Sequence, residues 1–278
     1  MKRGFPQSVC FRVTRACNAR CGFCLAPWDG EHPSGEVLLH RIDWLTDRGV
    51  RIVHFCGGEP TIHPALGSLI ARARERGATA RLTTNGIAMP EPLLEALRRH
   101  RVHVKVSLHG GRAWHDRMVG RPAYEAATGT LRRLLAAGVA ASVQTTLVAG
   151  GAGVLAEMIA FCLDAGVRRL SVLPFIPRGD GAAREAEFAL SDAERRGLRQ
   201  TMAVQRRRLA GRLDLRWLDF RTDTAPVVEA DGRVLLEGPR EARDALLAVI
   251  PTPAPAPPAA HPGEPDDRRA RLRVLPPP

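Results

Sequence analysis

Long apolar runs are missing from this 278-residue sequence, and lysine is almost missing as well. A membrane-spanning helix needs about 18 consecutive apolar residues, so the absence of such a run excludes a span. The basic N-terminus, MKRGFPQSVCFRV, lacks the apolar segment that a signal peptide requires. We therefore expect a cytoplasmic protein, in which cysteines serve metal binding or catalysis more often than disulfides.

Lysine occurs only at Lys2 and Lys105, so arginine supplies nearly all of the 41 basic residues and the net charge of +12. A charge of this size would suit a nucleic-acid partner if it were gathered in one stripe. The arginines are instead scattered over helix-like segments, and only Arg206–Arg208 form a compact run. The charge therefore does not indicate nucleic acid as the substrate, and we expect neither nucleic acid nor a membrane as a partner.

Strand-like apolar runs alternate with amphipathic helix-like segments through the first two thirds of the chain. The predicted strands are Ser8–Thr14, Val50–Phe55, Thr79–Thr84, Val102–Leu108, Val139–Val148 and Arg168–Leu173. The predicted helices are Glu36–Asp47, Pro64–Arg76, Pro90–His100, Tyr124–Ala137 and Leu155–Asp164. Repeated β-then-α units imply a parallel sheet with right-handed crossovers. The predicted fold class is therefore α/β, a partial (β/α)6 barrel.

The predicted strand in "HVKVSLHG" alternates strictly between apolar and polar residues. Alternation with a period of two places His103, Lys105, Ser107 and His109 on one face. In a barrel this face is the lumen, and the active sites of β/α barrels lie at the carboxyl ends of the strands. The alternative is an edge strand with one solvated face.

The pattern changes after residue 180. Ser191 is typical of a helix N-cap, for a helix that runs to about Leu209. "APVVEADGRVLLEG" predicts a hairpin that turns at Asp231-Gly232. Proline-rich composition predicts a disordered tail. We expect three parts, namely a barrel core (1–180), a small C-terminal cap made of a helix and a β-hairpin (181–250) and the tail (251–278).

Three cysteines with the spacing C-x3-C-x2-C, Cys17, Cys21 and Cys24, directly follow the first predicted strand. A structural zinc site would need a fourth ligand, for which only His32, Cys10 or Cys56 are candidates, none at typical spacing. An iron–sulfur cube usually takes four cysteines. With three, one iron would remain open to a small molecule, and an open metal position is typical of a reactive centre.

Further motifs stand at successive predicted strand ends. "GGEP" (57–60) follows the second strand, "TTNG" (83–86) closes the third, and "SLHG" (107–110) closes the fourth and is followed by "HDRMVGR". Phe23 precedes the third cysteine, and "LPFIPRG" (173–179) ends the sixth strand. Together with the cysteine triad these motifs resemble the radical S-adenosylmethionine (radical SAM) superfamily. The resemblance covers about residues 8–180 and points to the branch that contains the molybdenum-cofactor cyclase and SPASM-type enzymes.

The resemblance implies two cofactors, a [4Fe-4S] cluster held by Cys17, Cys21 and Cys24, and SAM on the fourth iron. It implies close approach of SAM to Gly57 and Gly58. The other SAM contacts that it implies are Glu59 for the ammonium, Thr84 and Asn85 near the ribose or carboxylate, Ser107 and Gln144 as polar contacts, and Phe23 with Leu173–Phe175 at the adenine. An electron donor such as flavodoxin or ferredoxin would start cleavage of SAM to a 5′-deoxyadenosyl radical, which abstracts hydrogen from the substrate.

The positions of the cysteines bear on the substrate. No cysteine follows Cys162, and the auxiliary clusters of the SPASM-type enzymes and the molybdenum-cofactor cyclase need such cysteines. We therefore expect a small polar metabolite (a sugar, nucleoside or amino acid) that undergoes dehydrogenation, epimerisation, decarboxylation or rearrangement, for example in natural-product biosynthesis. Lys105 and His109 are the candidate catalytic residues. One alternative is a peptide or protein substrate, and another is a non-catalytic cluster-binding sensor, which would not need GGEP and TTNG.

Overall fold

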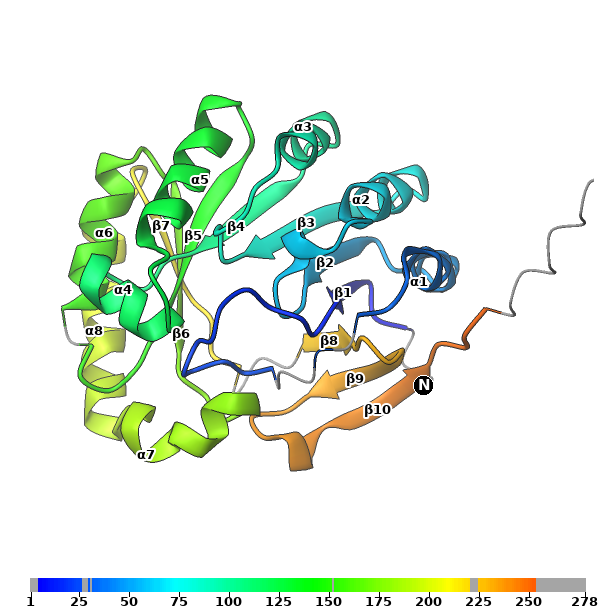
Figure 1. The fold of residues 1–278 in the computed structure, drawn as a ribbon. Helices are drawn as coiled ribbons and strands as arrows, with labels where there is room; N and C mark the ends of the chain where they lie inside the picture. Colours follow the sequence, from blue (N-terminus) through cyan, green and yellow to red (C-terminus); the bar gives the residue numbers. More distant parts are fainter. Residues whose placement is uncertain (1–4, 27–29, 31, 152, 221–224, 254–278) are drawn as a thin grey trace, which may run out of the picture.

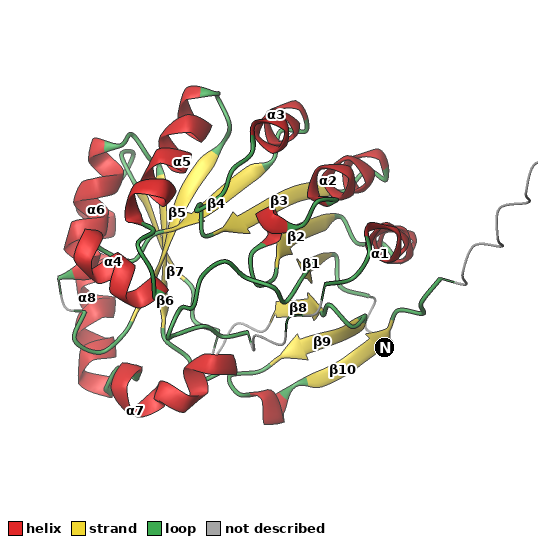
Figure 2. Cartoon of the chain, in the orientation of Figure 1, coloured by secondary structure: helices red, strands yellow, loops and turns green. Residues whose placement is uncertain are grey.

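A computed structural model describes residues 5–26, 30, 32–151, 153–220 and 225–253 of the chain. Within these ranges the strands form one ten-stranded sheet in the order β10-β9-β8-β1-β2-β3-β4-β5-β6-β7. The sheet curves into an open barrel, and the helices that connect its parallel strands cover its outer face (Figures 1 and 2). The predicted α/β partial barrel is therefore confirmed.

The parallel strands run in chain order around the barrel. They are β1 (Ser8–Arg12), β2 (Ile52–Cys56), β3 (Thr79–Thr84), β4 (His103–Ser107), β5 (Ala141–Leu147), β6 (Arg169–Pro174) and β7 (Asp214–Trp217). The first six correspond to the predicted strands. The sequence analysis did not include β7, because its four residues alternate charged and apolar side chains and are too few for a clear strand pattern. Pairing of Arg169 with Asp214 and of Val172 with Trp217 adds this strand to the barrel.

The helices are α1 (Gly35–Asp47), α2 (Leu66–Glu75), α3 (Glu91–Arg99), α4 (Arg112–Val119), α5 (Tyr124–Ala136), α6 (Val154–Asp164), α7 (Glu185–Phe188) and α8 (Asp192–Arg208), with short 3-10 turns at Pro60–Ile62, Gly179–Arg184 and Glu241–Arg243. Ser191 caps α8 as predicted, because its hydroxyl accepts a hydrogen bond from the backbone N–H of Glu194 at 3.2 Å. The sequence analysis predicted no helix between residue 180 and Ser191, where the structure has the short helix α7. Helix α4 was also missed, and it lies in the "HDRMVGR" region.

Strand β4 lies between β3 and β5, so the edge-strand interpretation of "HVKVSLHG" is wrong. Val104 and Val106 are fully buried, and the other face of the strand carries Lys105 and Ser107. Both of these polar residues line cavities inside the barrel. The alternation in the sequence therefore separates the core between sheet and helices from a polar lumen.

The predicted hairpin is present as β8 (Ala225–Val228) and β9 (Arg233–Glu237), and β10 (Ala245–Val249) adds a third antiparallel strand. Strand β8 pairs in parallel with β1, so the hairpin continues the barrel sheet beyond its first strand. The division at residue 180 into a core and a cap stays a prediction. Residues 254–278 of the predicted tail lie outside the described residues.

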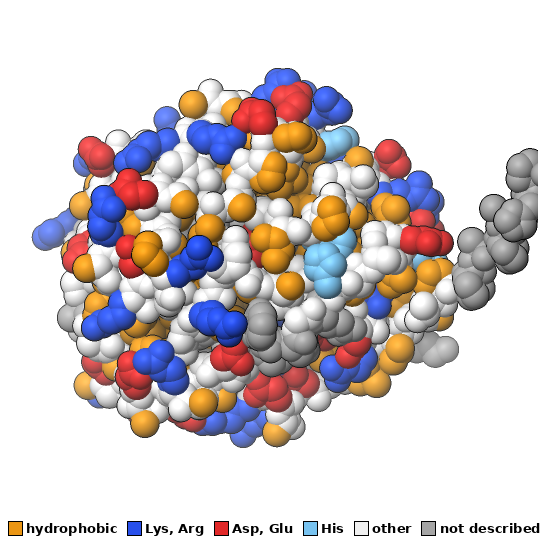
Figure 3. Space-filling model, in the orientation of Figure 1, with side chains coloured by type: hydrophobic (Ala, Val, Ile, Leu, Met, Phe, Trp, Pro, Cys, Tyr) orange, Lys and Arg blue, Asp and Glu red, His pale blue; other side chains and the backbone are white. Residues whose placement is uncertain are grey.

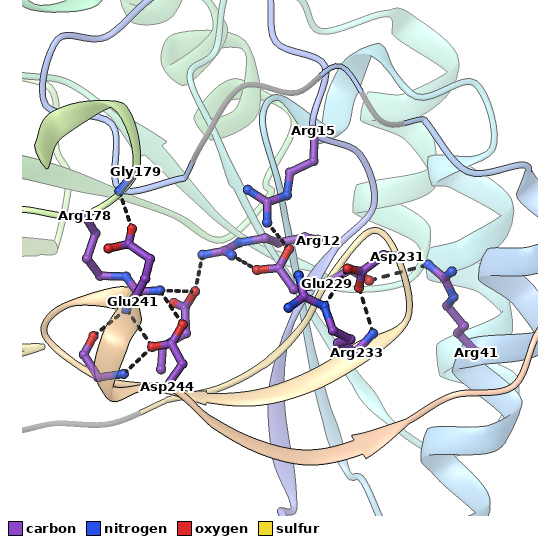
Figure 4. A network of polar contacts seen from close by, with 12 residues as sticks. Arg12, Arg15, Arg41, Arg178, Gly179, Glu229, Asp231, Arg233, Glu241 and Asp244 are labelled. Atoms are coloured by element: carbon purple, nitrogen blue, oxygen red, sulfur yellow. Dashed lines mark hydrogen bonds and ion pairs between the residues drawn. The ribbon is translucent and has the colours of Figure 1, made fainter. Parts of the chain in front are cut away.

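Ion pairs fasten the hairpin to the first strand (Figure 4). The carboxylate of Glu229, at the hairpin turn, binds the guanidinium groups of Arg12 and Arg15. Arg12 also pairs with Glu237 on β9 at 2.8 Å, and each of these four side chains is less than 15% exposed. Removal of one partner from a buried ion pair leaves an uncompensated charge, which is costly, so these contacts depend on one another.

Charge on the outer surface is more dispersed. On the face shown in Figure 3, basic and acidic side chains alternate, and neither kind forms a continuous patch. No helix in the described ranges has the length and apolar character needed to cross a membrane.

We predict that Glu229→Gln destabilises the protein by about 3–5 kcal/mol, because it leaves two buried guanidinium groups without their shared carboxylate. Thermal or denaturant unfolding measures the effect. Glu125→Gln is the control, since Glu125 pairs with Arg112 at the surface and should change stability by less than about 1 kcal/mol. Equal stability of the two variants would show that the Glu229 pairs do not hold the hairpin.

Candidate active site

A cavity of about 190 Å³ opens at the carboxyl ends of the parallel strands. It is lined by the three motif cysteines and by every SAM-contact residue expected from the sequence, namely Cys17, Cys21, Cys24, Phe23, Gly57, Gly58, Glu59, Thr84, Asn85, Ser107, Gln144, Leu173, Pro174 and Phe175. His109 also lines it, whereas Lys105 does not. Residues from six separate segments of the sequence therefore meet in this upper cavity.

The cysteine loop, residues 17–26, is attached at its start to the end of β2. The N–H of Gly58 donates to the carbonyl of Thr14 at 2.7 Å, and the N–H of Glu59 donates to the carbonyl of Ala16 at 2.9 Å. A side chain on Gly57 or Gly58 would overlap the carbonyl oxygens of Thr14 and Ala16. These glycines are therefore required by the crossing of two backbone segments, in addition to any approach of SAM.

The far part of the loop is attached to two elements that the sequence analysis did not connect with it. The N–H groups of Arg20 and Gly22 donate to the carbonyls of Val119 and Met118 at the end of α4, at 3.0 and 3.2 Å. The N–H of Gly181 donates to the carbonyl of Cys24 at 2.9 Å. The "HDRMVGR" segment therefore has a structural reason to accompany the cysteine triad, because it holds the loop in place.

The three thiols suit an iron–sulfur cluster in their chemistry and placement. All three line the upper cavity, and the N–H of Ala19 points to the sulfur of Cys17 at 3.4 Å. No group of His, Cys, Asp or Glu side chains in the described ranges converges as ligands of a single metal ion. A [4Fe-4S] cube instead distributes its thiolates over separate iron corners. Burial raises the pKa of Cys17 to about 11 and also raises the pKa values of Cys21 and Cys24. The positive charge of iron would favour the thiolates in this site.

Glu59 is buried and joins the ends of two strands. Its Oε1 accepts hydrogen bonds from the hydroxyl of Thr84 at 2.7 Å and from the N–H and hydroxyl of Thr61 at 3.0 and 2.6 Å. Its Oε2 accepts from the N–H of Asn85 at 2.7 Å. Burial raises the pKa of this carboxyl, and the hydrogen bonds act against the shift. Through these hydrogen bonds Glu59 positions the ends of β2 and β3 relative to each other. Oε2 accepts one hydrogen bond in the structure and can accept a second.

Asn85 links the end of β3 to the cysteine loop. Its side-chain N–H donates to the Oδ1 of Asn18 at 2.7 Å, while its own Oδ1 accepts from the N–H of Ile87 at 2.9 Å. Asn18 was not among the expected site residues. Its place inside the cysteine motif was the available signal, but a partner sixty-seven positions away is not visible in the sequence.

His109 lies against the ring of Phe23, with 4.6 Å between the ring centroids. Burial lowers the pKa of His109 to about 3, so the ring is neutral near pH 7. Its Nδ1 accepts from the N–H of Thr146 at 3.1 Å, which leaves the proton on Nε2. His109 can therefore donate one hydrogen bond at the wall of the cavity, and it is not an acid near neutral pH.

Lys105 lines a second, lower cavity of about 360 Å³ inside the barrel. The two cavities share lining residues, among them Cys56, Thr83, Gln144 and Leu173, so the lower cavity continues the upper one into the lumen. The structure thus places the two catalytic candidates at different levels, His109 in the upper cavity and Lys105 in the lower.

The site and the fold define a known class of enzymes. The profile of the radical SAM superfamily matches residues 11–171, more than half of the chain, and the chain belongs to this superfamily. Members of the superfamily use a [4Fe-4S] cluster and SAM, and family membership assigns these cofactors to the chain.

Two sequence relatives and one solved structure are informative. The chain is 28% identical over 214 residues to a PqqA peptide cyclase of Streptomyces rochei, which covers 75% of this chain and 59% of that protein. It is 31% identical over 147 residues to the mycofactocin maturase MftC of Mycobacterium tuberculosis, and this match covers 50% of this chain and 37% of MftC. The structure of Streptococcus suis SuiB with its precursor peptide SuiA matches with a TM-score of 0.72 at 16% sequence identity. The match covers 83% of this chain and 59% of SuiB, and it shows the same fold. The chain spans about half the length of these proteins.

We predict that Gly58→Ala lowers stability and prevents uptake of the cluster, because the added methyl group displaces the backbone of residues 14–16. Overpacking of this kind costs about 1–3 kcal/mol or more. Iron content after anaerobic reconstitution and the melting temperature are the measurements. Gly67→Ala in α2 is the matched control, since its methyl group would have space and should leave both unchanged or raise stability. Normal iron content in Gly58→Ala would contradict the assignment.

Glu59→Gln separates a positioning task from direct contact with SAM. The amide keeps one acceptor but turns an N–H toward Asn85 or Thr84, so we expect a stability loss of about 1–3 kcal/mol together with about tenfold weaker SAM binding. The cluster should be retained. Weaker SAM binding with unchanged stability would indicate that Glu59 contacts SAM directly and does not position the strand ends. Glu157→Gln is the control, because Glu157 also accepts a backbone N–H, from Gly111 at 2.8 Å, outside the cavity.

Proposed function

We propose that this chain is a radical SAM enzyme that modifies a peptide. The observation that carries the proposal is the similarity to a PqqA peptide cyclase over three quarters of the chain. A small polar metabolite was the first expectation from the sequence, and the relatives favour the peptide alternative instead. In the sequence analysis, the lack of cysteines after Cys162 weighed against a SPASM-type peptide-modifying enzyme. This chain is nevertheless similar to a peptide cyclase over three quarters of its length.

In this proposal Cys17, Cys21 and Cys24 hold the cluster, and the residues around the upper cavity hold SAM. When bound, these cofactors supply a carbon-centred radical that abstracts hydrogen from the substrate, and an external electron donor such as flavodoxin or ferredoxin supplies the reducing electron. The chain itself positions the cofactors and shields them from water. Glu59 and Asn85 keep the ends of β2 and β3 against the cysteine loop, and the apolar wall at Phe23 and Phe175 keeps water away.

The lumen supports a substrate that inserts one side chain. The lower cavity has about the volume of a few large side chains and continues into the upper cavity, so a residue of a peptide could extend past the cofactor site while the rest of the peptide stays outside. The sensor alternative gains no support, because the residues around Glu59 build a complete polar site next to the cysteines.

The test uses the reconstituted enzyme with SAM and dithionite under anaerobic conditions. It is incubated separately with the peptide fraction and with the small-molecule fraction of an extract from the source cells, and 5′-deoxyadenosine is measured. We expect the peptide fraction alone to raise 5′-deoxyadenosine and to yield a peptide of altered mass. Stimulation by the small-molecule fraction alone would overturn the proposal. Cys24→Ala is the control. The parent should contain about four iron atoms per chain, and the variant should lose this iron together with all SAM cleavage.

A further inference from the structure

The charged groups around the lower cavity fall into two sets. Arg12 and Arg178 line it and are paired, since Arg178 binds Glu237 at 3.0 Å and Asp244 at 2.7 Å, and Arg12 binds Glu229 and Glu237 (Figure 4). With Arg15 on Glu229, three guanidinium groups face three carboxylates in this network. This side of the lumen is therefore close to neutral.

Lys105, on β4, differs from these arginines. It lines the same cavity and is mostly buried, yet no carboxylate in the described part of the chain forms an ion pair with it. Its neighbours in the sheet register are Thr83 on β3 and Ser142 on β5, both without charge. A buried ammonium without a counter-charge is costly, and proteins keep such a group where it meets a ligand.

The surroundings of Lys105 add further positive charge. Burial lowers the pKa of Lys105, and Arg81, Arg169 and Arg216 act in the same direction. The thiol of Cys10, which lines the same cavity, acts in the opposite direction. Arg169 and Arg216 share one carboxylate, that of Asp214, at 2.9 Å each. The end of the lumen near Lys105 thus carries more positive than negative charge and attracts an anion.

Neutral hydrogen-bonding groups accompany the ammonium. His54 and Thr83 line the lower cavity and bind each other, with 2.7 Å between Nε2 and the hydroxyl oxygen. Gln144 lines both cavities. Apolar side chains, among them Leu173, Ile176 and Leu218, complete the lining. A lysine with a few neutral polar groups beside apolar walls is the pattern of a site that orients one charged group of a ligand.

We propose that Lys105 binds a carboxylate of the substrate, from an acidic side chain or the C-terminus of a peptide, within the lower cavity. This placement sets the substrate's depth, because a carboxylate at Lys105 leaves the adjoining carbon atoms at the level of Gln144 and Leu173, which also line the upper cavity. Lys105 is then a specificity-determining residue and not a proton donor. The assignment to a peptide rests on the proposed function, whereas the binding of an anion at Lys105 does not.

The two-lysine composition allows a direct test. The cluster-loaded enzyme with SAM and without reductant is labelled with ¹³C at the lysine Cε atoms, and Lys105→Met assigns the two signals. The probes are N-acetylglutamate amide, its neutral counterpart N-acetylglutamine amide, and inorganic phosphate. We expect the Lys105 signal to shift with the glutamate probe, to stay in place with the glutamine probe, and the Lys2 signal not to move.

Calorimetry gives the second measurement. The affinity for N-acetylglutamate amide should fall about ten- to hundredfold in Lys105→Met, since a charge-assisted hydrogen bond is lost. Arg132→Met, which removes an exposed cation of α5 outside the lining of both cavities, should change it by less than about twofold.

Each other outcome overturns the proposal. Equal shifts with the glutamate and glutamine probes would show that charge is not recognised, and no shift with any probe would show that Lys105 binds no anion. A shift with phosphate alone would assign the cavity to a phosphorylated ligand. None of these measurements depends on turnover, so binding of the glutamate probe with no peptide product would refute the peptide function and leave the carboxylate site intact.

Discussion

The contact between two backbone segments at the carboxyl ends of β1 and β2 supports the rest of the site. Residues 14–16 pass so close to Gly57 and Gly58 that neither glycine has room for a side chain. The two hydrogen bonds made there fix the first residue of the cysteine loop relative to the sheet. A loop that carries three cluster ligands needs such a fixed origin, because an error of about 1 Å in ligand position is enough to weaken a metal site.

From this contact a circuit of hydrogen bonds extends through the site. Glu59, directly after the glycines, holds Thr84 and Asn85 at the end of β3, and Asn85 binds Asn18 within the cysteine loop. The end of α4 and Gly181 hold the far part of the same loop. Because the circuit closes on itself, it joins the cavity walls from β1, β2 and β3, and loss of one member leaves buried groups of the others without a hydrogen-bond partner.

The lumen shows a second principle, the sorting of charge. Where the hairpin β8–β9 meets β1, arginines and carboxylates are matched in buried pairs that serve the fold. On β4 a lysine is left without a carboxylate in the described part of the structure and faces a cavity. The matched charges stabilise the barrel wall, and the unmatched one is available to a ligand, so burial alone does not distinguish structural from functional charges.

The sequence by itself determined the local features of this protein. The cysteine spacing, the glycine-rich strand ends, the Ser191 cap and the alternation in β4 each depend on residues within a few positions of one another, and the structure contains all of them. The tertiary structure decided which distant groups meet. The parallel pairing of β8 with β1, the bond of Asn85 to Asn18 and the sharing of Glu229 by Arg12 and Arg15 join residues separated by 67 to 217 positions. No local pattern encodes such partners, because their choice depends on the closure of the whole barrel. That Lys105 faces a cavity without a carboxylate in the described part of the structure likewise becomes visible only when the strands are assembled.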